Sequence, residues 1–121
     1  MDTLSITDMM NMQKELQEKY KGIWSPVSPE NAQSSLLWAI GEMGEIIDIF
    51  KKTGYEKACS DSETRIHLME ETTDVMMYLW DMLACMNITP EEFSRVYVRK
   101  HSYNMKRTYV SGHFTDTENG K

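Results

Sequence analysis

Several features are scarce in this chain of 121 residues, and each scarcity excludes a class of protein. The two cysteines, Cys59 and Cys85, show neither a CxxC spacing nor a zinc-ligand pattern, so we expect reduced thiols in a cytoplasmic protein. The longest uninterrupted apolar run, Val75–Trp80, is far too short to cross a bilayer. The N-terminal segment has neither a basic region nor a sustained apolar stretch. We therefore expect no signal peptide and no membrane partner.

Positive charge is also in short supply. The chain has 13 Lys and Arg against 19 Asp and Glu, which gives a net charge of −6. General nucleic-acid binding needs a basic surface, so we predict no nucleic-acid partner. An acidic protein still binds a phosphate compound where a divalent cation lies between the two negative partners. The charge therefore leaves phosphate ligands open.

The remaining composition favours one small helical domain. Proline and glycine are sparse, at 3 and 6 residues, whereas methionine reaches 11. Methionine is unbranched and fills irregular gaps between helices. With 40% hydrophobic residues the chain can bury a modest core, and small domains commonly gain stability by oligomerisation.

Helix boundaries can be placed from capping signals. We expect a first helix over Ile6–Tyr20 and a second that begins with Ser28 as N-cap and ends before Gly54. Tyr55–Asp61 is expected to connect it to a third helix, capped by Ser60 and ending near Asn87. The fourth helix follows the Thr89-Pro90-Glu91-Glu92 cap and continues to about residue 107.

These elements predict an all-α fold. We expect an antiparallel bundle of four main helices, completed by dimerisation or tetramerisation into a homodimer or homotetramer. Residues 1–109 form a single domain in this interpretation, and residues 110–121 form a flexible C-terminal tail.

The second helix carries a pair of acids. Glu42 and Glu45 lie about 60° apart on the helical wheel, so their carboxylates point the same way. The apolar face expected to meet the core lies nearly opposite and comprises Leu36, Ile40, Met43, Ile47 and Phe50. Trp38 lies on the acidic side, and Gly41 and Gly44 flank the pair. An ordinary solvated face is the alternative to a binding site.

The third helix repeats the arrangement with Glu71, Asp74 and Tyr78 at positions i, i+3 and i+7. Such pairs on two packed helices can converge four carboxylates on one hard cation, which takes oxygen ligands. A di-iron bundle usually needs Glu-x-x-His, but here the i+3 residue is Glu45 or Asp74. The pattern therefore favours Mg²⁺, with Mn²⁺ as a substitute, over iron.

One face of the fourth helix becomes basic along its length. Phe93, Val96 and Tyr97 are followed at helical spacing by Lys100, Asn104 and Arg107. These last three side chains are suited to hold phosphate. The alternative is that cations near a helix C-terminus merely complement the helix dipole.

Together, the acids and the basic face resemble the MazG-like, all-α nucleoside triphosphate pyrophosphohydrolases. That family carries Glu-x-x-Glu, a spacer and Glu-x-x-Asp, matched here by Glu42-Met43-Gly44-Glu45 and Glu71-Thr72-Thr73-Asp74. A later Lys-x-x-x-Asn-x-x-Arg element is matched at 100–107. The resemblance covers roughly residues 30–107, and Thr72-Thr73 stands where the family usually has a small apolar pair.

The resemblance implies an enzyme that hydrolyses a nucleoside triphosphate to the monophosphate and pyrophosphate and so cleans the nucleotide pool. Glu42, Glu45, Glu71 and Asp74 would ligate Mg²⁺, and Lys100, Asn104 and Arg107 would hold the triphosphate. We assign action on the attacking water to Glu42 or Glu45. Trp38 and Tyr78 are expected beside the base, although aromatics of a core or an interface would look the same.

Two other interpretations remain open. One is a non-catalytic acidic helical protein that acts as an interaction or regulatory partner. The other is a metal-dependent phosphatase of other phosphoanhydrides, which would release orthophosphate. The sequence leaves the preferred base undetermined.

Overall fold

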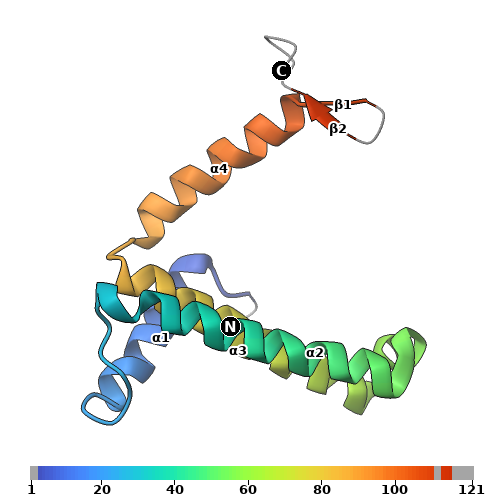
Figure 1. Ribbon diagram of the computed structural model, residues 1–121, viewed down its shortest axis with the longest axis horizontal. Helices are drawn as coiled ribbons and strands as arrows, with labels where there is room; N and C mark the ends of the chain where they lie inside the picture. The colour runs from blue at the N-terminus through green and yellow to red at the C-terminus, as the bar shows by residue number, and fades with distance from the viewer. Residues whose placement is uncertain (1–2, 111–112, 116–121) are drawn as a thin grey trace. The chain divides into compact units, whose positions relative to one another are not determined.

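The computed structural model describes residues 3–110 and 113–115 and is helical over most of that length (Figure 1). The elements are α1 (Ile6–Lys19), a 3-10 turn η1 (Pro29–Asn31), α2 (Ala32–Ser60), α3 (Ser62–Cys85), α4 (Pro90–Lys106), β1 (Thr108–Val110) and β2 (His113–Thr115). The predicted all-α class is confirmed. None of the described helices combines the length and the apolar composition that crossing a membrane requires.

The chain divides into two compact units, Met1–Ile88 and Thr89–Lys121, and each is described by itself. The first holds α1, η1, α2 and α3. The second holds α4 and a small antiparallel hairpin in which β1 pairs with β2. The four-helix bundle and the single domain over residues 1–109 stay predictions. Of the predicted tail, Val110 and β2 lie in this hairpin, and its other residues lie outside the described part of the chain.

The first unit is built on the contact between α2 and α3. Only Asp61 separates the two helices in sequence, so they run antiparallel and side by side (Figure 1). Small residues of α2 lie in the contact: Ala39 is completely buried and Ser35 nearly so. The buried residues of α3 are Val75, Trp80, Asp81 and Cys85. Helix α1 packs against α3 and buries Met10.

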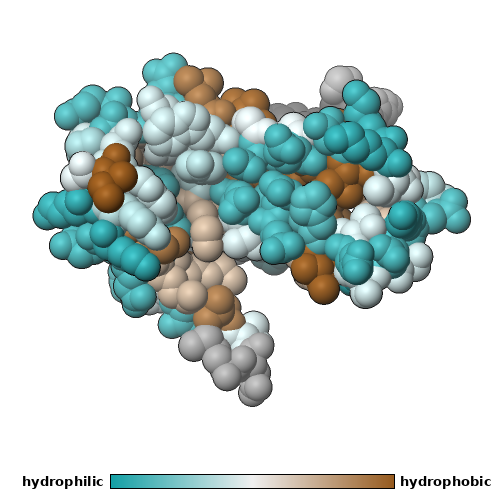
Figure 2. Space-filling view, turned by 90° about the horizontal axis from the view of Figure 1, so that it is seen from below, coloured by the Kyte–Doolittle hydropathy of each residue, from teal (hydrophilic) through white to brown (hydrophobic). Residues whose placement is uncertain are grey.

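The prediction of which face of α2 meets the core is wrong. The expected apolar face is exposed within the first unit, at Leu36, Ile40, Met43, Ile47 and Phe50, which we call the apolar stripe. Ile40 and Ile47, for example, are each 56% exposed. The helix is apolar nearly all round, so its periodicity does not identify the packed face, and the small residues decide it by allowing close approach. Figure 2 shows one face of the molecule, on which apolar side chains reach the surface among hydrophilic ones.

The connection between α2 and α3 also differs from the prediction. Gly54 has φ 80° and ψ 158°, which interrupts α2, but the helix resumes and continues to Ser60. The cap of α3 is Asp61 and not Ser60. Its Oδ2 accepts hydrogen bonds from the Thr64 backbone N at 3.0 Å and from Thr64 Oγ1 at 2.7 Å. A carboxylate is favoured here because the helix N-terminus carries partial positive charge.

The predicted end of α3 and start of α4 are confirmed, and Asn87 has the expected positive φ, 58°, just after α3. Ser28 is instead the N-cap of η1, without a side-chain hydrogen bond to its backbone, and α2 begins at Ala32 with Asn31 as N-cap. Thr89 caps α4 by accepting a hydrogen bond from the Glu92 backbone N at 3.1 Å. Helix α1 begins with a capping box between Ser5 and Asp8.

Two glycine substitutions test the interruption of α2. Gly54→Ala should lower the free energy of unfolding by about 1–3 kcal/mol, because an alanine is strained at this φ and ψ. Gly44→Ala is the matched control, since Gly44 is helical and a methyl group added there would meet open space. It should raise stability by about 0.5–1 kcal/mol. Denaturant unfolding measures both, and equal effects would contradict the assignment.

Candidate functional site

Three carboxylates come together on the packed faces of α2 and α3. Glu42 of α2 and Glu71 and Asp74 of α3 each offer an oxygen, and these oxygens lie within 4.8 Å of one another. Glu71 and Asp74 share a face because they are three residues apart on one helix. Glu42 meets them because its side of α2 is the side that packs on α3. We call these three residues the acid cluster.

Glu45, the fourth predicted acid, lies outside the acid cluster. Its side chain is exposed, and it lines a separate hollow together with Asp48, Lys52 and His67. Its charge still acts on Glu42. His67 is exposed, and its Nε2 lies 3.3 Å from Glu71 Oε1. The structure therefore brings together three of the four predicted acids, and Glu45 lies outside this group.

The acid cluster is electrostatically unfavourable without a cation. Burial raises the pKa of Glu42 above its ordinary 4.5, and a hydrogen bond with Glu71 raises it further. The charges of Asp74, Glu71 and Glu45 act in the same direction. A positive ion at this position would reverse the effect, because it favours the ionised carboxylate.

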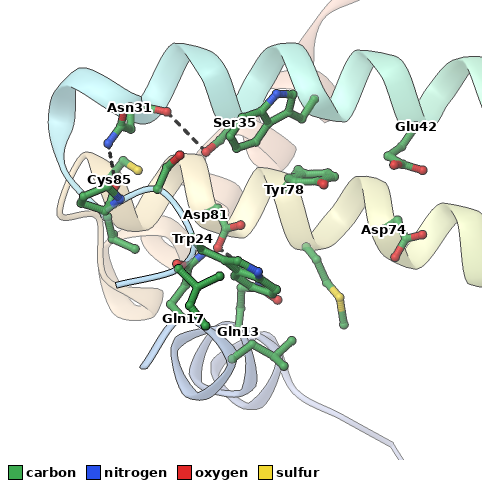
Figure 3. Close-up of a pocket in the computed structure, with 17 residues that line it drawn as sticks. Gln13, Gln17, Trp24, Asn31, Ser35, Glu42, Asp74, Tyr78, Asp81 and Cys85 are labelled. Atoms are coloured by element: carbon green, nitrogen blue, oxygen red, sulfur yellow. Dashed lines mark hydrogen bonds between the residues drawn. The ribbon is translucent and has the colours of Figure 1, made fainter. Parts of the chain in front are cut away.

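A pocket of about 520 Å³ adjoins the acid cluster within the first unit (Figure 3). Its size is typical of small-molecule sites, which measure about 300–1,000 Å³. Glu42 and Asp74 lie at one end of it. Its other walls come from α1, the loop before η1 and the neighbouring turns of α2 and α3. Besides the two acids it is lined by Gln13, Leu16, Gln17, Ile23, Trp24, Ser25, Pro26, Val27, Asn31, Ser35, Trp38, Met77, Tyr78, Asp81 and Cys85.

The helical repeat arranges this lining in matching order on the two antiparallel helices. Each helix contributes an acid, then an aromatic residue, then a polar residue, at spacings of three or four that keep them on one face. The series are Glu42, Trp38 and Ser35 on α2, and Asp74, Tyr78 and Asp81 on α3. Along the pocket, the acids Glu42 and Asp74 are thus followed by aromatic rings and then by the buried polar residues Ser35 and Asp81.

The aromatic residues at the middle of the pocket contact each other. The rings of Trp38 and Tyr78 have centroids 5.8 Å apart and planes inclined by 58°. Burial raises the pKa of Tyr78, and the charges of Glu42, Asp74 and Asp81 raise it further, so the phenol stays protonated and can donate a hydrogen bond. Both predicted aromatic residues therefore line the same pocket as two of the acids.

Beyond the aromatic rings, the pocket is lined by a buried polar pair, Gln13 of α1 and Asp81 of α3. Gln13 Nε2 donates to Asp81 Oδ1 at 3.0 Å, and each residue is only 6% exposed. Burial raises the pKa of Asp81, and hydrogen bonds from Gln13 and Gln17 oppose that rise. Gln13 Oε1 is buried without a partner. An unpaired buried acceptor costs about 1–3 kcal/mol.

Trp24 closes the remaining side from the loop after α1. Its backbone N donates to Tyr20 O at 2.9 Å, in a turn that includes Gly22 at φ 88°. The Trp24 and Tyr20 rings stack, with centroids 4.4 Å apart and planes inclined by 18°. The loop is thereby fixed so that an indole ring lines the pocket.

The predicted phosphate-binding residues lie in the second unit. Lys100 and Asn104 are on α4, and Arg107 is its C-cap. Lys100 Nζ lies 5.0 Å from the centroid of the Tyr103 ring, and Arg107 Cζ lies 5.5 Å from it, so both cations gather on one aromatic ring. Their role toward the triphosphate stays a prediction.

The sequence analysis missed most of the pocket lining. Asp81 and Ser35 could have been found, because each lies seven residues from a predicted acid and hence on the same helical face. Gln13, Gln17 and Trp24 carry no such signal. They belong to segments whose position against α3 is set by tertiary packing.

The repulsion within the acid cluster can be measured. In the presence of a chelator, Glu42→Gln should unfold at a higher temperature than the unmodified protein at neutral pH. The folded state holds the Glu42 proton more tightly than the unfolded chain, so wild-type stability falls as pH rises above 4.5. The advantage of the variant should therefore vanish below pH 4.5.

Thermal unfolding as a function of pH tests this expectation. Glu70→Gln is the control, because Glu70 is exposed on α3 and lies outside the acid cluster. A stabilisation of Glu42→Gln that is independent of pH would contradict the explanation.

Comparisons of the chain with protein-family models, with curated proteins and with solved structures find no match.

Proposed function

We propose that the protein is a Mg²⁺-dependent nucleoside triphosphate pyrophosphohydrolase that acts in sanitation of the nucleotide pool. The observation that carries the proposal is the position of the acid cluster at one end of a pocket lined by aromatic rings. Phosphates held through a cation at the acidic end would direct the nucleoside toward these rings. The Glu-x-x-Glu and Glu-x-x-Asp motifs support the same activity.

The residues present fit a magnesium ion. Carboxylate oxygens are the hard ligands that Mg²⁺ prefers, and the oxygens of Glu42, Glu71 and Asp74 are close enough to share one ion after small side-chain adjustments. The raised pKa of Glu42 is consistent with three charges that need compensation. Manganese takes similar oxygen ligands and is expected to substitute. When bound, the ion neutralises the triphosphate and polarises the α-phosphoryl group.

The chain's own groups then direct hydrolysis. A water oxygen attacks the α-phosphorus, the bond between the α-phosphorus and the bridging oxygen breaks, and pyrophosphate leaves. Glu45 is suited to accept the water proton, because it lies beside the acid cluster without belonging to it. Glu42 is the alternative acceptor. The motif resemblance assigns Lys100, Asn104 and Arg107 to hold the triphosphate. Of these, the cations Lys100 and Arg107 are suited to stabilise the departing pyrophosphate.

We also infer self-association, because the apolar stripe of α2 is uncovered within the first unit. Contiguous apolar surface of this kind commonly marks an interaction site. Ile40→Glu would place a charge in the stripe and should reduce the oligomer mass in sedimentation analysis. Lys52→Glu, an exposed change on nearly the opposite side of the same helix, should leave it unchanged. A wild-type monomer would contradict the inference.

The same stripe also favours the rival interpretation, a non-catalytic helical interaction protein. The two are separated by thermal stabilisation. An enzyme of the proposed kind should be stabilised by Mg²⁺ together with a non-hydrolysable nucleoside triphosphate, whereas an interaction module should respond to neither. A phosphatase of other phosphoanhydrides would differ by releasing orthophosphate.

Substitutions in the acids test the proposed activity. Glu71→Gln and Asp74→Asn should each lower Mg²⁺-dependent pyrophosphate release by about a hundredfold or more. Even substitutions of residues that only hydrogen-bond to metal ligands lower metal affinity or activity by about 10–100-fold. Glu45→Gln should lower kcat while leaving Mg²⁺ affinity nearly unchanged, because Glu45 is outside the acid cluster.

A panel of nucleoside triphosphates with pyrophosphate detection provides the measurement, and Mg²⁺ titration provides the affinity. Glu70→Gln is again the matched control and should keep wild-type turnover. Full activity of Glu71→Gln or Asp74→Asn would remove the acid cluster from the chemistry.

A further inference from the structure

The buried polar pair beyond the aromatic rings of the pocket has no part in the proposed chemistry. Asp81 lies seven residues beyond Asp74 on α3, which places it about 10 Å farther along the helix axis. A nucleotide whose phosphates lie at the acid cluster would pass its sugar along Trp38 and Tyr78. Its base would then reach the corner that Gln13 and Asp81 form (Figure 3).

The pair presents acceptors to that corner. Gln13 uses its amide nitrogen to donate to Asp81 Oδ1, and its Oε1 is buried without a partner. Asp81 has no lysine, arginine or histidine paired with it among the residues of the first unit that the structure describes. Hydrogen bonds from Gln13 and Gln17 use only part of the accepting capacity of the Asp81 carboxylate, which has about four accepting sites. That carboxylate and Gln13 Oε1, both in residues more than nine-tenths buried, therefore offer two acceptors to one group that carries two N–H bonds.

We propose that Gln13 and Asp81 select a nucleobase with an amino group at C4 of a pyrimidine or C6 of a purine, cytosine or adenine. The two amino hydrogens would meet Asp81 Oδ2 and Gln13 Oε1. Uracil and hypoxanthine carry a carbonyl oxygen at the corresponding position, and that oxygen would face two acceptors without a donor between them. A site that hydrogen-bonds a donor strongly rejects analogues lacking it, because its buried polar groups are then left unpaired.

The assignment rests on the proposed function for the direction in which the nucleotide lies, so its test avoids catalysis. Neutral deoxynucleosides bind without phosphate, metal or turnover. Ligand-observed NMR titrations in chelator would compare two matched pairs, deoxycytidine with deoxyuridine and deoxyadenosine with deoxyinosine. We expect the amino member of at least one pair to bind about tenfold more tightly or better, and which pair responds distinguishes cytosine from adenine.

Substitutions locate the preference. Asp81→Asn puts an amide in place of the carboxylate with almost the same shape and offers a donor to a carbonyl. The preference should fall to about equality or reverse toward deoxyuridine or deoxyinosine. Asp48→Asn is the control, because Asp48 is exposed and lines the other hollow, and it should keep the wild-type ratio. Gln13→Met, which removes one acceptor, should also reduce the ratio and decides the question if Asp81→Asn fails to fold.

The outcomes separate this assignment from the proposed function. Equal binding within both pairs, or a wild-type ratio in folded Asp81→Asn, overturns the assignment even if pyrophosphate is released from triphosphates. A clear amino preference that Asp81→Asn abolishes supports it even if no triphosphate is hydrolysed.

Discussion

The close antiparallel contact between α2 and α3 is the constraint on which the rest of the first unit depends. Ala39 and Ser35 give α2 a side without bulky side chains, so α3 can approach it closely. That same side carries Glu42, so the packing that stabilises the unit also presses this acid against Glu71 and Asp74. The same interface therefore buries apolar surface and brings carboxylates together. Burial and the neighbouring acids both raise the pKa of Glu42.

A conflict of this kind points to function, because a protein under selection for stability alone would place other residues at these positions. The pocket beside the acid cluster shows a second example. Gln13 and Asp81 lose solvation on burial, and Gln13 Oε1 stays unpaired. Between the two polar ends lie the Trp38 and Tyr78 rings. Charge, aromatic surface and hydrogen-bonding groups thus follow one another along the packed helices, and the proposal of a nucleotide ligand is based on this order.

The apolar stripe shows where reasoning from periodicity fails. In an amphipathic helix the apolar side identifies the core, but α2 is apolar on most of its circumference. Hydrophobicity alone would place Ile40 and Ile47 in the core, but both are exposed. The face that packs is the one that carries the small residue Ala39. Size decides because dispersion contacts require close approach, and a helix can reach α3 only where side chains are short. The larger residues are left for an interaction outside the first unit.

The sequence by itself determined the four main helices, the Thr89 cap of α4, the end of α3 at Asn87 and the sharing of one face by Glu71 and Asp74, since these features depend on residues three to seven apart. Tertiary structure decided which side of α2 packs, that Glu45 stays outside the acid cluster, and that Gln13 meets Asp81, 68 positions away. Asp61 displaced Ser60 as a cap because a carboxylate accepts two bonds from Thr64. Local spacing follows from backbone geometry, whereas contacts between distant segments depend on the shape and size of every side chain between them.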